Sequence, residues 1–158
     1  WRDYLARSAA ALAAKGVDGF FLDNTDVYDQ VSQTEIFDGL VLIIADLGQY
    51  RKDIIINGGD VFVRKAVLAP ARPLVHITGV NQECVFTNID FSKNVLTGQQ
   101  ADTTEYYCEY LEWCAAEGYA VYLTEYADTQ HKAPLQTMEA YCRKHGFACY
   151  MAPSKWLE

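Results

Sequence analysis

The 158-residue sequence is short of positive charge and of long apolar runs. Lysine and arginine number 13 against 21 aspartates and glutamates, which gives a formal net charge of -8. Because nucleic-acid binding needs a basic face, no nucleic-acid partner is expected. A neutral or cationic ligand suits this charge, although many acidic proteins owe it only to solubility. No apolar run approaches the length of a membrane span, so no membrane partner is expected.

The motifs of several common enzyme classes are also missing. The histidines are scattered along the chain: His76, His131 and His145. Without HxH or HExxH spacing they predict no zinc site, and there is neither a GxSxG elbow nor a Walker loop. No cofactor or metal is therefore expected. A divalent cation held by the oxygens of Asp23, Glu83 and Glu125 remains the alternative.

The cysteine pattern predicts no disulfide framework. There are five, an odd number, without a CxxC pair: Cys84, Cys108, Cys114, Cys142 and Cys149. We expect buried or half-buried free thiols, which fits a reducing or anaerobic setting.

Helical stripes alternate with short apolar runs along the chain. Helices are expected at residues 2–15, 32–48, 60–68, 103–117 and 134–145, and strands at 17–22, 54–56, within 75–85, 119–124 and 147–151. Ser32 with Glu35 predicts a capping box, Asp60 and Thr103 predict further caps, and glycines end several helices. The long polar stretch after residue 85 is expected to be a loop.

Strands separated by helices predict parallel βαβ units. Two architectures fit five such strands. One is an open doubly wound sheet, complete at this length. The other is part of a (β/α)8 barrel, which typically needs about 250 residues. The pattern alone does not separate them.

Polar side chains gather where the expected strands end, which is where ligands bind in both architectures. The segments are 22–29, 57–60, 81–84 and 124–126, rich in carboxylates, amides and tyrosines. Paired carboxylates with aromatic rings are typical of sugar sites. Glu83 lies in an apolar stretch where an unpaired carboxylate is costly. Asp23 could equally be a turn residue, Asn57-Gly58-Gly59 only a turn with positive φ, and Tyr126 ordinary packing.

The segment Gly16–Tyr28, GVDGFFLDNTDVY, resembles a motif of glycoside hydrolase family 114. Later elements resemble that family in the same order: IIINGG at 54–59, VNQECVF at 80–86, GYAVYLTEY at 118–126 and GFACYMA at 146–152. The family fold is a (β/α)8 barrel. The resemblance places these motifs on barrel strands four to eight, so residues 1–158 are expected to be a single barrel domain lacking three N-terminal βα units.

The resemblance implies an extracellular or cell-envelope glycosidase that cleaves α-1,4-linked galactosamine polymers. It assigns Asp23 as nucleophile and Glu83 as general acid/base, the two-carboxylate arrangement of such enzymes. The substrate-binding residues that it implies are Asn24, Asp26, Tyr28, Asn57, Gly58, Glu125 and Tyr126. Asp26 or Asp29 would pair with the ammonium groups of a cationic polysaccharide.

Two other functions remain open on the sequence. One is a non-catalytic carbohydrate-binding remnant of such a barrel, and the other is an unrelated α/β domain that binds a small ligand or a protein partner. If the five strands are a barrel segment, its unpaired edges at 17–22 and 147–151 predict that the chain dimerises, aggregates or is completed by further polypeptide, whereas a stable monomer would favour the open sheet.

Overall fold

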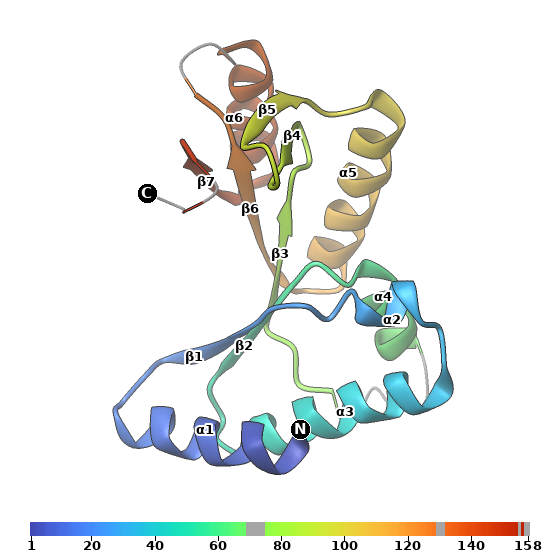
Figure 1. Cartoon of the computed structure of the whole chain (residues 1–158), viewed down its shortest axis with the longest axis vertical. Helices are drawn as coiled ribbons and strands as arrows, with labels where there is room; N and C mark the ends of the chain where they lie inside the picture. Colours follow the sequence, from blue (N-terminus) through green and yellow to red (C-terminus); the bar gives the residue numbers. More distant parts are fainter. Residues whose placement is uncertain (69–74, 129–131, 155, 157–158) are drawn as a thin grey trace. The chain divides into compact units, whose positions relative to one another are not determined.

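Five strands alternate with helices along the chain and form one sheet in the computed structural model (Figure 1). The structure describes residues 1–68, 75–128, 132–154 and 156. The strands, in their order across the sheet, are β1 (Gly19–Leu22), β2 (Asp53–Asn57), β3 (Gly79–Glu83), β6 (Ala120–Tyr126) and β7 (Ala148–Ala152). The fold is therefore α/β, as the sequence predicts.

The strand order decides between the two expected architectures. A doubly wound sheet reverses its strand order at a switch point. Here the strands follow the order of the sequence without reversal, as successive strands of a (β/α)8 barrel do. The five parallel strands thus form part of a barrel-like sheet. The chain divides into two compact units, Trp1–Gly79 and Val80–Glu158.

The described residues of the first unit form β1, β2 and several helices. The helices are α1 (Arg2–Ala14), α2 (Val27–Gln30), α3 (Thr34–Gly48) and α4 (Asp60–Leu68). The strands pair in parallel from Gly19 with Asp53 to Leu22 with Ile56. A Cβ atom at Gly19 would lie 2.7 Å from the Asp53 carbonyl oxygen, so this close approach of the two strands requires glycine.

The core of the first unit comes from one face of α3, from β2 and from α4. Its most buried members are Ile44, Ile54, Ile56, Phe62, Val63 and Ala66, each 0% exposed. Helices α1 and α3 pack against each other at the foot of this unit (Figure 1). The apolar residues that recur with helical spacing in α3 lie on the face of the helix that is buried.

The second unit contains β3, β6 and β7, the helices α5 (Ala101–Ala116) and α6 (Lys132–His145), and a hairpin of β4 (Thr87–Asp90) and β5 (Val95–Gly98). Strands β6 and β7 pair in parallel from Tyr122 with Ala148 to Tyr126 with Ala152. The buried side chains of the two helices are Tyr110, Leu111, Cys114, Met138 and Cys142.

Three helix starts differ from the sequence prediction. The Ser32–Glu35 capping box is wrong, because the Ser32 hydroxyl donates to the Tyr28 carbonyl at 3.3 Å and α3 begins at Thr34 without a side-chain cap. Thr103 is not a cap either, since α5 begins two residues before it. Asp60 is the first helical residue of α4 and not its N-cap. These starts lie within about two residues of the predicted ones, which is the usual spread of helix boundaries.

The polar stretch after residue 85 is not a loop, and this expectation is corrected. It forms the antiparallel β4–β5 hairpin, in which Thr87 pairs with Gly98 and Asp90 with Val95. The cysteines are free as expected, but Cys149 is exposed, whereas the sequence predicts burial or half-burial for all five. Among the described residues no helix is long and apolar enough to cross a membrane. His131 lies outside the described residues.

Candidate active site

Asp23 follows the carboxyl end of β1, and one of its two carboxylate oxygens is held by hydrogen bonds. Its Oδ1 accepts hydrogen bonds from the Asn57 side-chain amide and from the Asn24 backbone N–H, each at 2.9 Å. Within the described part of the chain, Oδ2 accepts no hydrogen bond, and the residue is exposed. One oxygen is therefore oriented by two donors, and the other accepts no hydrogen bond from the described residues.

The backbone on both sides of this pair is shaped by left-handed residues. Asn24 has a φ of 61°, and Gly58 and Gly59 each have a φ of 65°. A Cβ atom at Gly59 would lie 2.4 Å from the Thr25 hydroxyl oxygen. Thr25 is itself buried, and its hydroxyl donates to the Asn57 carbonyl at 3.3 Å. The turn predicted at 57–59 is present, and it places the Asn57 amide on Asp23.

A group of acidic side chains lies on the residues that follow. Asp26 is half-buried and precedes α2, Asp29 lies on α2, and Asp60 begins α4 with 6% exposure. The pKa of Asp29 is raised to about 6. The causes are partial desolvation of the Asp29 carboxyl and the negative charges of Asp60 and Asp26. Asp29 is exposed as a residue, so the desolvation is confined to part of the side chain. This group carries a negative charge that grows between acidic and neutral pH.

Tyr28 does not present its ring to solvent. It is 5% exposed, and its ring lies beside Phe37 at a centroid distance of 5.6 Å. The Lys65 ammonium donates to the Tyr28 hydroxyl at 2.5 Å. The hydroxyl and the ring are thus engaged within the first unit, and we assign Tyr28 to its core and not to a sugar platform.

Glu83 ends β3 in the second unit. It is half-buried, and its Oε2 accepts a hydrogen bond of 2.9 Å from the Tyr126 hydroxyl. Tyr126 ends β6 and is 3% exposed, so its hydroxyl is held in place by the packing of its ring. Tyr126 packs in the core, as one interpretation of the sequence predicts. Its hydroxyl also orients the Glu83 carboxylate.

Glu125 has a different position from its two neighbours. Its side chain is 0% exposed, and its two carboxylate oxygens accept four hydrogen bonds. The donors are the backbone N–H groups of Val85, Phe86 and Thr87, at 2.8–3.0 Å, and the Thr87 hydroxyl, at 2.5 Å. Burial raises the pKa of Glu125 against the opposing effect of these hydrogen bonds. We assign Glu125 to anchoring the start of the hairpin.

The period of a strand explains why these residues separate. Successive side chains point to opposite faces, so Thr124 and Tyr126 share one face of β6, and Glu125 lies on the other. The Thr124 hydroxyl donates to Asn81 Oδ1 at 3.1 Å, and Asn81 shares a face of β3 with Glu83. One face of the second unit therefore carries a hydroxyl, an amide, a carboxylate and a phenol.

The sequence prediction missed the part played by the hairpin. The Gln99 amide donates to the Cys84 carbonyl at 2.9 Å, and the Thr104 hydroxyl donates to the Val85 carbonyl at 2.7 Å. Both contacts fix the segment that directly follows Glu83. The signal in the sequence is weak and consists of an asparagine at 94, a residue that tolerates the left-handed turn.

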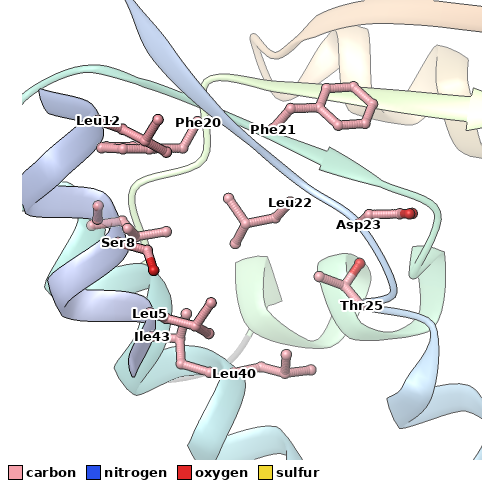
Figure 2. Close-up of a pocket in the computed structure, with 12 residues that line it drawn as sticks. Leu5, Ser8, Leu12, Phe20, Phe21, Leu22, Asp23, Thr25, Leu40 and Ile43 are labelled. Carbon is pink, nitrogen blue, oxygen red and sulfur yellow. The ribbon is translucent and has the colours of Figure 1, made fainter. Parts of the chain in front are cut away.

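A pocket of about 260 Å³ opens in the first unit, between α1, α3 and β1. Figure 2 shows Leu5, Leu12 and Leu22 among the apolar side chains that line it, with Asp23 and Thr25 on the strand side. An apolar lining does not suit a polar sugar chain, so we do not include this pocket in the site. Among the described residues, no group of three or more His, Cys, Asp or Glu side chains could hold a metal ion.

Comparison with known proteins finds the fold and no close relative. No family model matches the chain, and no curated protein matches its sequence. The chain is similar in structure to the glycoside hydrolase domain of PelA from Pseudomonas aeruginosa, with a TM-score of 0.74 and 18% identity over 96% of this chain. A variant of that domain in which a glutamate is replaced by alanine matches to the same extent. The chain spans 59% of the length of these structures.

Proposed function

We propose that the protein is a retaining glycoside hydrolase, with Asp23 as nucleophile and Glu83 as general acid/base. The observation that carries this proposal is that each carboxylate follows or ends a parallel strand with one oxygen oriented by a neighbour. Asn57 orients Asp23 at 2.9 Å, and Tyr126 orients Glu83 at 2.9 Å. In a barrel-like sheet the carboxyl ends of the strands carry the catalytic groups. The fold shared with a glycoside hydrolase domain supports the same reading.

The proposed reaction has two displacements. Glu83 donates its proton to the glycosidic oxygen as Asp23 Oδ2 attacks the anomeric carbon, so the C–O bond breaks and a glycosyl ester forms. Glu83, now a carboxylate, then takes a proton from water as that water attacks the ester, which releases Asp23 and the sugar. The Asn57 amide keeps Oδ1 occupied and leaves Oδ2 for the attack.

We further propose a polymer of α-1,4-linked galactosamine as the substrate. A net charge of -8 and the acidic group of Asp26, Asp29 and Asp60 favour a cationic chain over an anionic one. Asp26 would pair with a substrate ammonium group in this proposal. An extracellular or cell-envelope location accords with such a substrate and is proposed with it.

The testing experiment measures release of oligosaccharides from the galactosamine polymer by the full-length protein. Glu83→Gln is expected to lose about 10²–10⁴-fold in kcat, the usual worth of general acid–base catalysis. Asp23→Asn removes the attacking anion and should lose turnover while it retains substrate binding. Asp38→Asn and Glu139→Gln are matched controls, because both side chains are exposed on helices.

Two results would overturn the proposal in different ways. Full activity of Glu83→Gln would contradict the assignment of the general acid/base. Binding of the polymer without hydrolysis by the unsubstituted protein would replace the enzyme by a carbohydrate-binding protein.

A further inference from the structure

The β4–β5 hairpin is firmly attached to the segment that follows Glu83. The backbone N–H groups of Val85, Phe86 and Thr87 all donate to the buried Glu125 carboxylate. The Gln99 backbone N–H donates to the Phe86 carbonyl at 3.0 Å on the returning side. Charge-assisted hydrogen bonds to a buried carboxylate are strong. The base of the hairpin therefore does not move independently of the strand that ends in Glu83.

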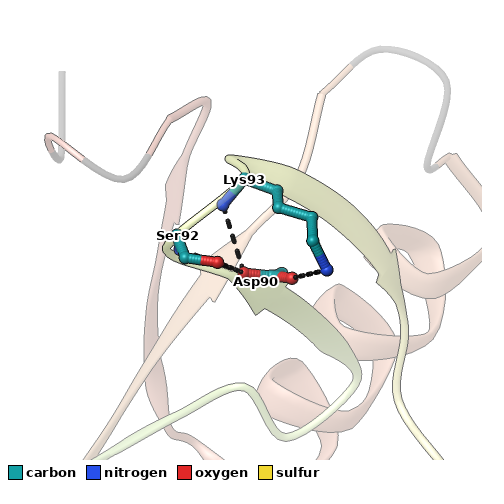
Figure 3. A network of polar contacts seen from close by, with 3 residues as sticks. All are labelled: Asp90, Ser92 and Lys93. Atoms are coloured by element: carbon teal, nitrogen blue, oxygen red, sulfur yellow. Dashed lines mark hydrogen bonds and ion pairs between the residues drawn. The ribbon is translucent and has the colours of Figure 1, made fainter.

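The turn of the hairpin is fixed by the Asp90 carboxylate. One oxygen accepts from the Ser92 hydroxyl at 2.6 Å and from the backbone N–H groups of Ser92 and Lys93 at 3.0 and 3.1 Å. The other oxygen lies 2.9 Å from the Lys93 ammonium (Figure 3). Asn94 completes the turn with a φ of 55°. This network holds the residue between Asp90 and Ser92 in one position.

That residue is Phe91, and its ring lies next to Tyr126. The ring centroids are 5.3 Å apart and the planes meet at 82°, an edge-to-face contact. Tyr126 in turn donates its hydroxyl to Glu83. Phe91 is thus separated from the proposed general acid/base by one buried aromatic ring. Although it contacts Tyr126, Phe91 remains 50% exposed.

The surroundings of Tyr126 explain why the two rings keep this arrangement. Ile89 and Ala152 bury Tyr126 in a small apolar cluster, with Cys84 and Leu96 packed against it. The ring of Phe91 is the exposed continuation of this cluster. Half of the Phe91 side chain is accessible to solvent, on the same side of the hairpin turn as Tyr126 and within one ring of Glu83, so it can contact an apolar face of a ligand held at Glu83.

We infer that Phe91 forms the aromatic wall of a sugar-binding subsite next to Glu83. This subsite rests on the proposed function, and it takes one pyranose ring of the galactosamine chain. The C–H face of the sugar would pack on the Phe91 ring, and the ammonium group adds an attraction to its π face. The hairpin then positions the substrate, while Glu83 carries out the proton transfers.

The test measures affinity by isothermal titration calorimetry, with α-1,4-galactosamine oligomers and the full-length protein. A Glu83→Gln background prevents turnover during the titration. Phe91→Ala should weaken binding about tenfold, because an aromatic contact with a cation–π component contributes about 1.4 kcal/mol. Phe91→Trp, which retains a ring, should stay within about threefold of the parent.

A second variant distinguishes the contribution of the aromatic ring from that of an apolar side chain of similar size. Phe91→Leu keeps an apolar side chain in the turn and should fold like the parent, yet it lacks the π face and should also lose affinity. Tyr106→Ala is the matched control, because Tyr106 is 43% exposed on α5, and its affinity should not change. N-acetylated oligomers, which carry no ammonium group, should lose less affinity on Phe91→Leu than the cationic ones do.

The outcomes distinguish the subsite from the proposed function. Unchanged affinity in both Phe91→Ala and Phe91→Leu would overturn the subsite and leave the glycosidase proposal intact. Failure of the unsubstituted protein to bind or cleave any of these oligomers would overturn the glycosidase proposal, and the subsite with it.

Discussion

The Asn57 amide nitrogen lies 2.9 Å from Asp23 Oδ1, and this contact joins the ends of two neighbouring strands. An amide donor stabilises the charged form of a carboxylate and fixes its orientation. Asn57 comes directly before two glycines with positive φ, so its side chain is positioned by the backbone of the turn. Asn57 is thus a positioning residue for the proposed nucleophile.

Replacing Asn57 should change the pH dependence of the reaction. Asn57→Ala removes the donor and is expected to lower kcat by about tenfold to a hundredfold, the worth of a hydrogen bond to a charged group. Asn57→Asp places a second carboxylate against Asp23 and should shift the acidic limb of the kcat profile to higher pH. Asn88→Asp, an exposed position on β4, is the control. An unshifted acidic limb in Asn57→Asp would contradict the role of this contact.

Ionisation of Asp29 should lower the free energy of unfolding as the pH rises. Its pKa of about 6 in the folded state lies above the ordinary value of 3.8, so the folded state favours the protonated form. Its stabilising contribution is fully present below pH 3.8 and is lost as the pH rises through about 6. Asp29→Asn should therefore raise the unfolding temperature at pH 7.5 but not at pH 3.5. Because the side chain is exposed, the gain is expected to stay below about 1 kcal/mol.

Thermal unfolding of both proteins across this pH range measures the difference. Asp38→Asn, which changes an exposed aspartate on α3, corrects for the loss of one negative charge. An equal effect of the two substitutions at every pH would show that the position of Asp29 confers no special pKa.

Glu125 should be required for folding more than for substrate contact. In Glu125→Gln one acceptor oxygen becomes an NH2 group that faces backbone N–H donors, so buried donors lose their partners. The expected cost is about 1–3 kcal/mol or more in the free energy of unfolding, measured with urea. Glu139→Gln on the exposed face of α6 should cost almost nothing. A variant of normal stability with weakened substrate binding would restore Glu125 to the substrate-binding residues.

The sheet edges support a proposal of self-association. Four of the five β7 residues are exposed, and among the described strands β1 and β7 lie at the two ends of the sheet. Exposed edges with unpaired backbone groups favour pairing with another chain. We expect the 158-residue chain to sediment as dimers or larger species at micromolar concentration. Met151→Lys on β7 should shift the population towards monomer, because an edge lysine discourages pairing. A stable monomer at all concentrations would contradict this proposal.

The sequence predicts the alternation of strands and helices well because α1, α3, α5 and α6 each end near a glycine and short apolar runs follow them. It also predicts that Asp23, Asn57, Glu83 and Tyr126 come at the ends of strands. It does not predict their contacts, since these depend on the tertiary arrangement of the turns. Glu125 is an example. The sequence places a carboxylate at a strand end but does not distinguish one that faces a ligand from one that accepts hydrogen bonds from backbone N–H groups, as Glu125 does.

The hairpin was harder to predict for another reason. Its strands have four residues each, TNID and VLTG, and neither shows the alternation of polar and apolar side chains that would distinguish it from a polar loop. The turn is built by Asp90 through local hydrogen bonds and is readable only once the strands on each side are known. Phe91 therefore gave no signal in the sequence, although the structure places it beside Tyr126.

In the proposed mechanism Asp23 forms a covalent bond to the sugar, and mass spectrometry of a trapped intermediate tests this step most directly. Glu83→Gln is treated with a galactosaminyl fluoride, whose leaving group needs little acid assistance, so the first displacement proceeds while the second lacks its base. We expect the mass of the peptide that contains Asp23 to increase by one glycosyl unit. The double variant Glu83→Gln/Asp23→Asn should show no such increase. A variant that accumulates no adduct, in an enzyme that releases products of inverted anomeric configuration, would contradict it.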